Sequence, residues 1–169
     1  MTELDELPYR RVHRARRELV FECMTTPEHL AQFWGPSGTT TSVDGITVDL
    51  RPGGVFETLM VNQVDGSQYT MRAVYQDVAP PERLVWREAA SGMVTTIMFN
   101  DLGDGTTEVV THQTNVPAHY RTAGARAGFA TSLNRFDGYI AALTATNSDG
   151  AGGSSPVLPK KETSDENCP

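Results

Sequence analysis

Two side chains of this sequence have the chemistry to transfer a proton or to orient a polar ligand, His112 and Tyr120. An imidazole has an ordinary pKa of about 6.5, so a histidine gains or loses a proton near neutral pH. A phenol can hold a carbonyl compound by a hydrogen bond while a neighbouring base deprotonates it. The simpler interpretation of His112 is a residue near a strand end that bonds a backbone carbonyl or solvent. We favour this simpler interpretation of His112, and we keep His112 and Tyr120 as weaker catalytic candidates.

The other residue types that perform catalysis or bind metals lack the spacing that such sites need. The remaining histidines do not join His112 in a metal-binding pattern such as His-Glu-x-x-His, and the two cysteines, Cys23 and Cys168, are far apart. The sequence contains no Gly-x-Ser-x-Gly, and Cys23 lies in an apolar stretch where its thiol should stay neutral. We therefore predict no metal and no cofactor, and lean against an enzyme.

Charged residues suggest further roles that depend on where their side chains point. Arg51 and Arg72 can anchor an acidic ligand and Glu57 can act as a base if they turn inward. We expect all three to point outward. The arginines between Arg10 and Arg17 are expected to neutralise nearby acidic residues, with a contact surface for an acidic partner as the alternative.

A set of aromatic, thioether and aliphatic side chains falls on segments that should converge on one interior space. Burying one such side chain is worth about 1.5–3 kcal/mol with or without a ligand, so core packing explains any single member. Together they predict an apolar cavity for a small molecule. With His112 as a polar member, the predicted ligand-binding residues are Trp34, Phe56, Tyr69, Met71, Tyr75, Trp86, Met98, His112, Tyr120, Phe129, Leu133 and Phe136.

Two short helices are predicted after a first strand over residues 9–14. Apolar residues after that strand recur at helical spacing as far as Thr25. A second helix then starts with Thr26 as its N-cap and Pro27 in its first turn, and it stops at Gly35-Pro36. These helices interrupt the strands early in the chain.

The middle of the chain predicts a sheet. Between Thr40 and Asn115, six runs of strand-forming residues are separated by short turn sequences, which suit antiparallel neighbours. Tyr69, Met71, Ala73 and Tyr75 should share one face of a strand, while Thr70, Arg72 and Gln76 share the other. One face of the sheet is therefore expected to be apolar.

A long helix is predicted at the end of the folded region. An apolar stripe from Phe129 to Leu143 repeats at three and four residues, and the sheet must cover it. Gly124, Gly128 and Gly138 interrupt this helix, each at a cost of about 1 kcal/mol relative to alanine. They predict either a close approach of the backbone to another element or a helix whose start can move.

Four segments in this order resemble a known superfamily: Glu18 to Phe21, Pro27 to Pro36, Asp49 to Gly54 and Pro80 to Trp86, with weaker support from Thr111-His112. They resemble START-like (SRPBCC) helix-grip domains, and within these the activator-of-heat-shock-protein-ATPase homologue family, whose bacterial members are often called polyketide cyclase or dehydrase-like. The resemblance covers about residues 9–143. It implies an α+β, Bet v-like fold: a curved antiparallel sheet of about seven strands around a long C-terminal helix, with two short helices after the first strand.

The resemblance also implies a deep apolar cavity between the sheet and the last helix, with a ligand that differs between members. This chain departs from the usual pattern at two places. Ala15-Arg16 stands where members usually carry Ala-Pro, and Gly128-Phe129 stands where they carry Gly-Trp. The second change shrinks an aromatic side chain that usually reaches the cavity.

Length and charge limit the domain organisation and the partners. A chain of 169 residues with 38% hydrophobic residues suits one domain, predicted over 8–145 between an acidic tail over 1–7 and a disordered tail over 146–169. A formal net charge of −7 argues against binding to nucleic acid. No apolar run reaches the roughly 18 residues of a membrane span, and the cysteine usage suits the cytoplasm.

Three classes of function follow from these patterns. The leading hypothesis is a non-catalytic domain that binds or sequesters a small hydrophobic or aromatic molecule between the sheet and the last helix. The first alternative is a cyclase, dehydrase or hydrolase that acts on a polyketide-like substrate through His112 and Tyr120. The second is a module that binds a chaperone in the stress response, as the family resemblance implies. Monomer and homodimer both remain open.

Overall fold

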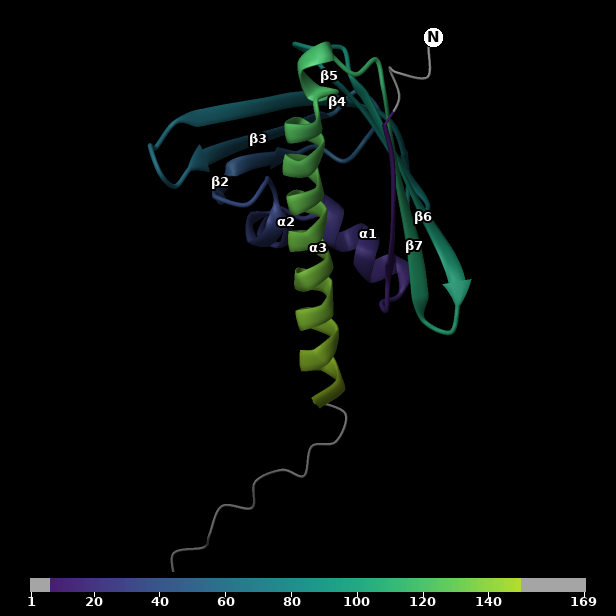
Figure 1. Cartoon of the computed structure of the whole chain (residues 1–169). Coiled ribbons are helices and arrows are strands. Elements are labelled where there is room, and N and C mark those ends of the chain that lie inside the picture. Colours follow the sequence, from purple (N-terminus) through teal and green to yellow (C-terminus); the bar gives the residue numbers. More distant parts are fainter. Residues whose placement is uncertain (1–6, 150–169) are drawn as a thin grey trace, which may run out of the picture.

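Seven antiparallel strands form one bent sheet around a long helix, as a computed structural model that describes residues 7–149 shows (Figure 1). The architecture is the predicted α+β helix-grip fold. The helical elements are α1 (Arg17–Thr25), α2 (Pro27–Phe33), the 3-10 turn η2 (Ala118–Tyr120) and α3 (Ala123–Asp149). The strands are β1 (Leu7–His13), β2 (Thr39–Val48), β3 (Val55–Asn62), β4 (Gln68–Ala79), β5 (Arg83–Glu88), β6 (Val94–Gly103) and β7 (Thr106–Thr114).

Two elements extend beyond the predicted domain range of 8–145: β1 starts at Leu7 and α3 continues to Asp149. The rest of the two predicted tails lies outside the described residues. Within the described range, no helix combines the length and the apolar character needed to cross a membrane.

The order of strands explains why the early helices lie where they do. The sheet has the order β1-β7-β6-β5-β4-β3-β2, so β2 to β7 follow one another as hairpin-linked neighbours. By contrast, β1 and β2 are separated by only two short helices in sequence and yet form opposite edges of the sheet. The α1–α2 segment must therefore span from one edge to the other.

Irregular pairing bends the sheet. The register shifts between Thr41 and Ile46 on β2 and between Tyr75 and Asp77 on β4. An extra residue on one strand of an antiparallel pair kinks that strand and increases its twist. In Figure 1, β2 and β3 diverge from β6 and β7, and α3 passes between the two halves of the sheet.

The two short helices form as predicted, with one difference at their junction. Pro27 occupies the first turn of α2, but the Thr26 side chain makes no capping bond; the Thr26 carbonyl accepts the first helical bonds from His29 and Leu30. Gly35 ends the α2 region with φ of +94°, a conformation that favours glycine. A Cβ at Gly35 would also lie 2.6 Å from the Thr39 hydroxyl oxygen.

The alternation predicted for the fourth strand is confirmed. Met71, Ala73 and Tyr75 are buried, whereas Thr70 and Arg72 between them are exposed. Successive side chains of a strand point to opposite faces, so the buried set lines the concave side of the sheet.

The second half of α3 is held firmly, mainly by α2 and β1. Phe136 is buried with its ring centroid 4.6 Å from that of Phe33. The guanidinium of Arg135 donates to the carbonyl oxygens of Trp34, Gly35 and Pro36, at 3.3, 2.8 and 3.2 Å. In contrast, the side chains from residue 123 to 134 are all partly or fully exposed. The helix is therefore anchored from residue 135 onward, while its first turns cover the sheet loosely.

No close contact in this structure requires a glycine at any of the three glycine positions of α3. A Cβ built at Gly124, Gly128 or Gly138 would meet nothing within 4 Å beyond the nearest parts of the helix. The predicted close approach of the backbone is therefore wrong, because the space beside each glycine is open.

Gly138→Ala is expected to stabilise the protein by about 0.5–1 kcal/mol, because it removes backbone entropy from the unfolded chain at an exposed helical position. Gly35→Ala is the matched control and should destabilise by more than about 1 kcal/mol, because of its positive φ and the close Thr39 oxygen. Urea unfolding followed by circular dichroism measures both. If both variants change the free energy of unfolding equally, Gly35 is no more restricted by its surroundings than Gly138, which would contradict the structure.

Candidate functional site

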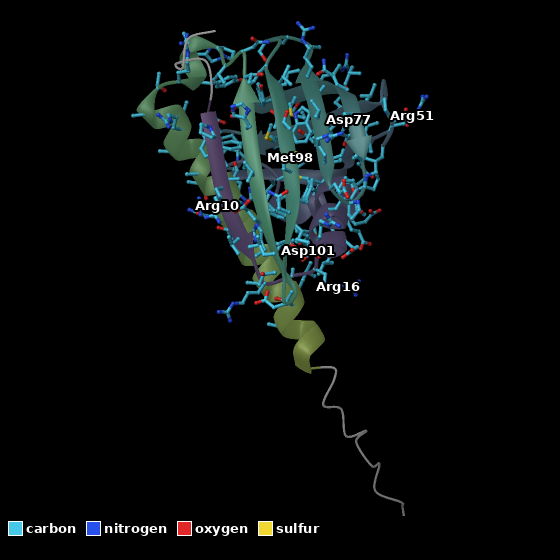
Figure 2. The ribbon with its side chains drawn as sticks, turned by 90° about the vertical axis from the view of Figure 1, so that its right-hand side faces the viewer. Arg10, Arg16, Arg51, Asp77, Met98 and Asp101 are labelled. Atoms are coloured by element: carbon cyan, nitrogen blue, oxygen red, sulfur yellow. The ribbon has the colours of Figure 1, made fainter. Side chains whose placement is uncertain are left out.

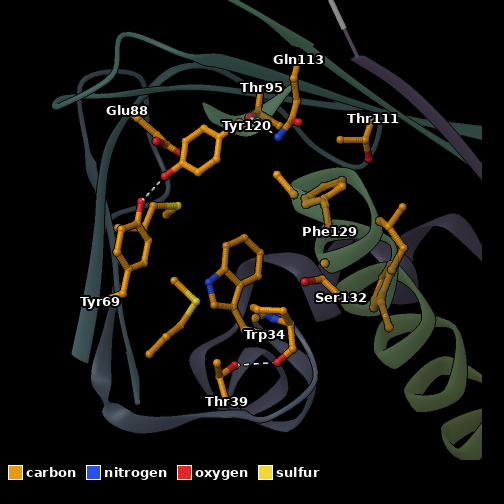
Figure 3. Close-up of a pocket in the computed structure, with 18 of the residues that line it drawn as sticks. Trp34, Thr39, Tyr69, Glu88, Thr95, Thr111, Gln113, Tyr120, Phe129 and Ser132 are labelled. Carbon is orange, nitrogen blue, oxygen red and sulfur yellow. Dashed lines mark hydrogen bonds between the residues drawn. The ribbon is translucent and has the colours of Figure 1, made fainter. Parts of the chain in front are cut away.

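A cavity of about 520 Å³ lies between the concave face of the sheet and the first turns of α3 (Figure 3). Residues from all seven strands, from α1, α2 and α3, and from η2 line it. The roof consists of α3 side chains such as Phe129, Ser132 and Leu133, which are only partly buried. The loosely covered part of α3 is therefore the part that closes the cavity.

The deep part of the cavity is apolar. Both tryptophans of the chain, Trp34 and Trp86, line it. The other deep apolar side chains come from separate elements and are almost fully buried. They are Met24, Phe33, Met71, Ile97 and Phe136.

Trp34 is held in place by a polar and an aromatic contact. Its indole N–H donates to the hydroxyl oxygen of Thr58 at 2.9 Å, and Thr58 is completely buried. Its ring packs edge-on against Phe56, with centroids 5.2 Å apart. Phe56 in turn stacks on Tyr75 at 5.6 Å and meets Trp86 at 5.1 Å. This second layer of rings packs behind the two tryptophans and supports the cavity wall.

Polar groups gather at the end of the cavity next to η2. The hydroxyls of Tyr69 and Tyr120 lie 3.0 Å apart, and the Glu88 carboxyl points toward them (Figure 3). Burial, the bond to Tyr120 and the charge of Glu88 together raise the pKa of Tyr69. Burial also raises the pKa of Glu88, while a bond from the Ser91 hydroxyl at 3.0 Å opposes that rise.

A second set of polar side chains lies on the part of the cavity wall that β6 and β7 form, which we call the floor. Thr95, Thr111 and Gln113 are buried and line the cavity. Thr95 and Gln113 face each other across the strand pair, and the amide of Gln113 approaches the Thr95 hydroxyl at 3.5 Å. The floor therefore offers hydroxyl and amide groups beside an otherwise apolar wall.

Most of the residues predicted to bind a ligand lie together around this cavity. Phe56 and Tyr75 are buried behind the wall, in the second layer of rings, and do not line it. The predicted residues that line the cavity are Trp34, Tyr69, Met71, Trp86, Tyr120, Phe129, Leu133 and Phe136.

His112 and Met98 do not lie on the cavity, contrary to the prediction. On β7, Thr111 and Gln113 point inward, so His112 between them points to the outer face. Met98 lies between the inward-facing Ile97 and Phe99 on β6 and also points outward. Figure 2 looks onto this outer side, where Met98 is labelled. The structure therefore separates the two catalytic candidates, His112 and Tyr120.

The charged candidates point outward, as expected. Arg72 pairs with Glu57 across neighbouring strands, and Arg51 pairs with Asp49 in a turn at 2.9 Å. Four of the N-terminal arginines have acidic partners. Arg16 pairs with the nearby Glu18, and the other three partners come from distant parts of the chain: Glu108 for Arg10, Asp137 for Arg11 and Glu82 for Arg17.

Among the described residues, no group of three or more His, Cys, Asp or Glu side chains is arranged to hold a metal ion. Cys23 is buried in α1, and burial together with the nearby Glu22 raises the pKa of its thiol to about 12. The thiol is therefore neutral, and a neutral thiol is a poor nucleophile.

The comparisons with known proteins identify the family. The family model described as "Activator of Hsp90 ATPase homolog 1-like protein" matches residues 14–141. This chain belongs to that family. The match confirms the family predicted from the sequence motifs. A search of curated proteins found none that matches the chain.

Several solved structures share the fold of this chain. A Chromobacterium violaceum protein matches with a TM-score of 0.72 and 22% identity, covering 79% of this chain and 95% of its own. A Nitrosomonas europaea protein matches with a TM-score of 0.72 and 23% identity, covering 86% and 99%. An AHSA1-like protein from Aeromonas hydrophila matches with a TM-score of 0.69 and 21% identity, covering 82% and 94%. At identities of 21–23%, the similarity to these structures shows a shared fold and nothing about a shared ligand.

Sequence reasoning included Tyr69 and Tyr120 but missed other polar members of the site, among them Glu88, Thr111 and Gln113. Glu88 lies two residues after Trp86 on the same strand, so the alternation that places Trp86 inward also turns Glu88 inward. The same rule relates Thr111 and Gln113 to the buried Val109. For Glu88 the alternation along β5 was a usable signal, whereas for Thr111 and Gln113 the sequence did not show which face of β7 lies inside.

Thr58→Val should destabilise the protein by about 1–2 kcal/mol, because it removes the acceptor of the Trp34 indole N–H without changing side-chain shape. Thr70→Val, on an exposed position of β4, is the matched control and should change stability by less than about 0.5 kcal/mol. Urea unfolding followed by tryptophan fluorescence measures both. If the two variants are equally stable, the Thr58 bond does not hold Trp34.

Proposed function

We propose that this protein binds a small hydrophobic or aromatic molecule in the cavity beneath α3 and holds it without chemical change. The observation that supports this most strongly is the cavity of about 520 Å³ with two tryptophans on its wall. Pockets that bind small molecules have volumes of about 300–1,000 Å³ and are mostly apolar, with a few polar groups that orient the ligand.

The loose cover over the cavity suits reversible binding. Side chains of α3 before residue 135 are partly exposed, while the helix from Arg135 onward is fixed to the segment after α2. Opening the first turns of α3 would break few buried contacts, so a ligand can enter without unfolding the core.

A binding role agrees better with the described residues than the enzymatic alternative does. In the part of the chain that the structure describes, neither a histidine nor a cysteine lines the cavity. Tyr120 is therefore without the imidazole that the cyclase or hydrolase hypothesis paired with it, since His112 lies on the other face. Acid–base catalysis needs its groups within hydrogen-bonding reach of one substrate.

Titration with N-phenyl-1-naphthylamine, a weakly basic probe that is neutral at neutral pH, tests this proposal. The only tryptophans of the chain line the cavity, so a bound probe should accept energy from their emission and saturate at one molecule per chain. Absence of saturable binding would contradict the proposal.

Gly128→Phe should weaken probe binding about tenfold or more, because the added ring extends from α3 into the open space of the cavity. Gly138→Phe is the matched control: the same substitution on the same helix, at an exposed position that does not line the cavity, should keep the wild-type affinity. Equal binding by both variants would place the probe elsewhere on the protein.

A further inference from the structure

We infer that the ligand of this cavity carries a basic nitrogen, which Glu88 binds as a counter-ion while the apolar body of the ligand packs against Trp34 and Trp86. The inference rests on the proposed function and adds the class of ligand. It depends on the charge of the cavity lining, on the position of one carboxyl and on the tyrosines beside it.

Glu88 is built into the wall rather than left at the surface by chance. It ends β5, two residues after the buried Trp86, and its backbone N–H donates to the Met93 carbonyl at 2.9 Å across a tight turn. The Ser91 hydroxyl donates to one carboxyl oxygen at 3.0 Å and fixes the side chain. The carboxyl is thus held in one orientation, pointing toward the two tyrosine hydroxyls (Figure 3).

The lining provides no positive charge to balance this carboxyl. Among the described residues that line the cavity there is no lysine, arginine or histidine, and Glu88 is the only acidic one. Arg87, its neighbour on β5, is exposed on the opposite face. A carboxylate in such surroundings is destabilised until a cation reaches it. A ligand with an ammonium group provides that cation, whereas an acidic ligand would be repelled.

The neighbouring side chains suit an ammonium group. Tyr69 and Tyr120 each present a hydroxyl oxygen that can accept a hydrogen bond and a ring face that attracts cations. Tyr69 is 49% exposed, so this polar end lies at the entrance of the cavity. An aromatic or aliphatic amine can therefore place its charged end at the entrance and its apolar body in the interior. The net charge of −7 of the whole chain also favours the approach of a cation.

Three probes of nearly equal shape separate the possible ligand classes: 1-naphthylmethylamine, 1-naphthylmethanol and 1-naphthoate. Each competes with N-phenyl-1-naphthylamine at neutral pH, where the first is a cation, the second neutral and the third an anion. We expect the amine to bind about tenfold or more tighter than the alcohol, since a charge-assisted hydrogen bond is stronger than one between neutral groups. We expect the carboxylate to bind most weakly.

Glu88→Gln keeps the shape of the side chain and removes its charge. It should reduce the preference for the amine over the alcohol to within about threefold, because only the charge-dependent part of the interaction is lost. Glu22→Gln, which removes a carboxyl from the exposed face of α1, is the matched control and should keep the wild-type preference.

The outcomes distinguish this inference from the proposed function. If N-phenyl-1-naphthylamine does not bind, the proposed function fails and the inference fails with it. If it binds and the alcohol or the carboxylate competes as well as the amine, the inference alone is overturned. An amine preference that survives Glu88→Gln also overturns it. A preference that disappears in Glu88→Gln and persists in Glu22→Gln supports it.

Discussion

The attachment of the second half of α3 is the constraint on which the rest of this structure depends. Arg135 donates to three successive carbonyl oxygens just after α2, and Phe136 packs between Phe33 and His13. These contacts fix the helix at one end of the sheet. The remaining turns extend over the concave face without tight packing, so the space beneath them stays open.

The sheet must also resist collapse for that space to persist. Irregular pairing on β2 and β4 bends the sheet, and the α1–α2 segment spans its two edges. Behind the cavity wall, Phe56 and Tyr75 form a second layer of rings against the two tryptophans. Because interiors are close-packed, these rings leave the wall side chains no room to move back from the cavity into the core. The cavity is therefore a consequence of how the core is filled.

Within a family whose members share this architecture, the lining distinguishes one protein from another. Here the wall is apolar over most of its area, and its one carboxyl, Glu88, sits beside two tyrosine hydroxyls at the entrance. The outer face carries the paired charges, such as Arg72 with Glu57. Charge on the outer face keeps the protein hydrated, whereas the Glu88 carboxyl is the one charge that a molecule entering the described cavity would meet.

The sequence by itself determined the elements and the family. Helical spacing identified the stripe from Phe129 to Leu143, and alternation identified the inward face of β4, because in both segments bulky apolar residues recur at the spacing of a single face. Only the tertiary structure decided which face of β6 and β7 lies inside. Threonine and apolar residues occur on both faces of these strands, so hydrophobicity did not distinguish Thr111 and Gln113 from His112, or Ile97 from Met98. A shift of one residue exchanges the two faces of a strand, and pairing with neighbouring strands fixes that register.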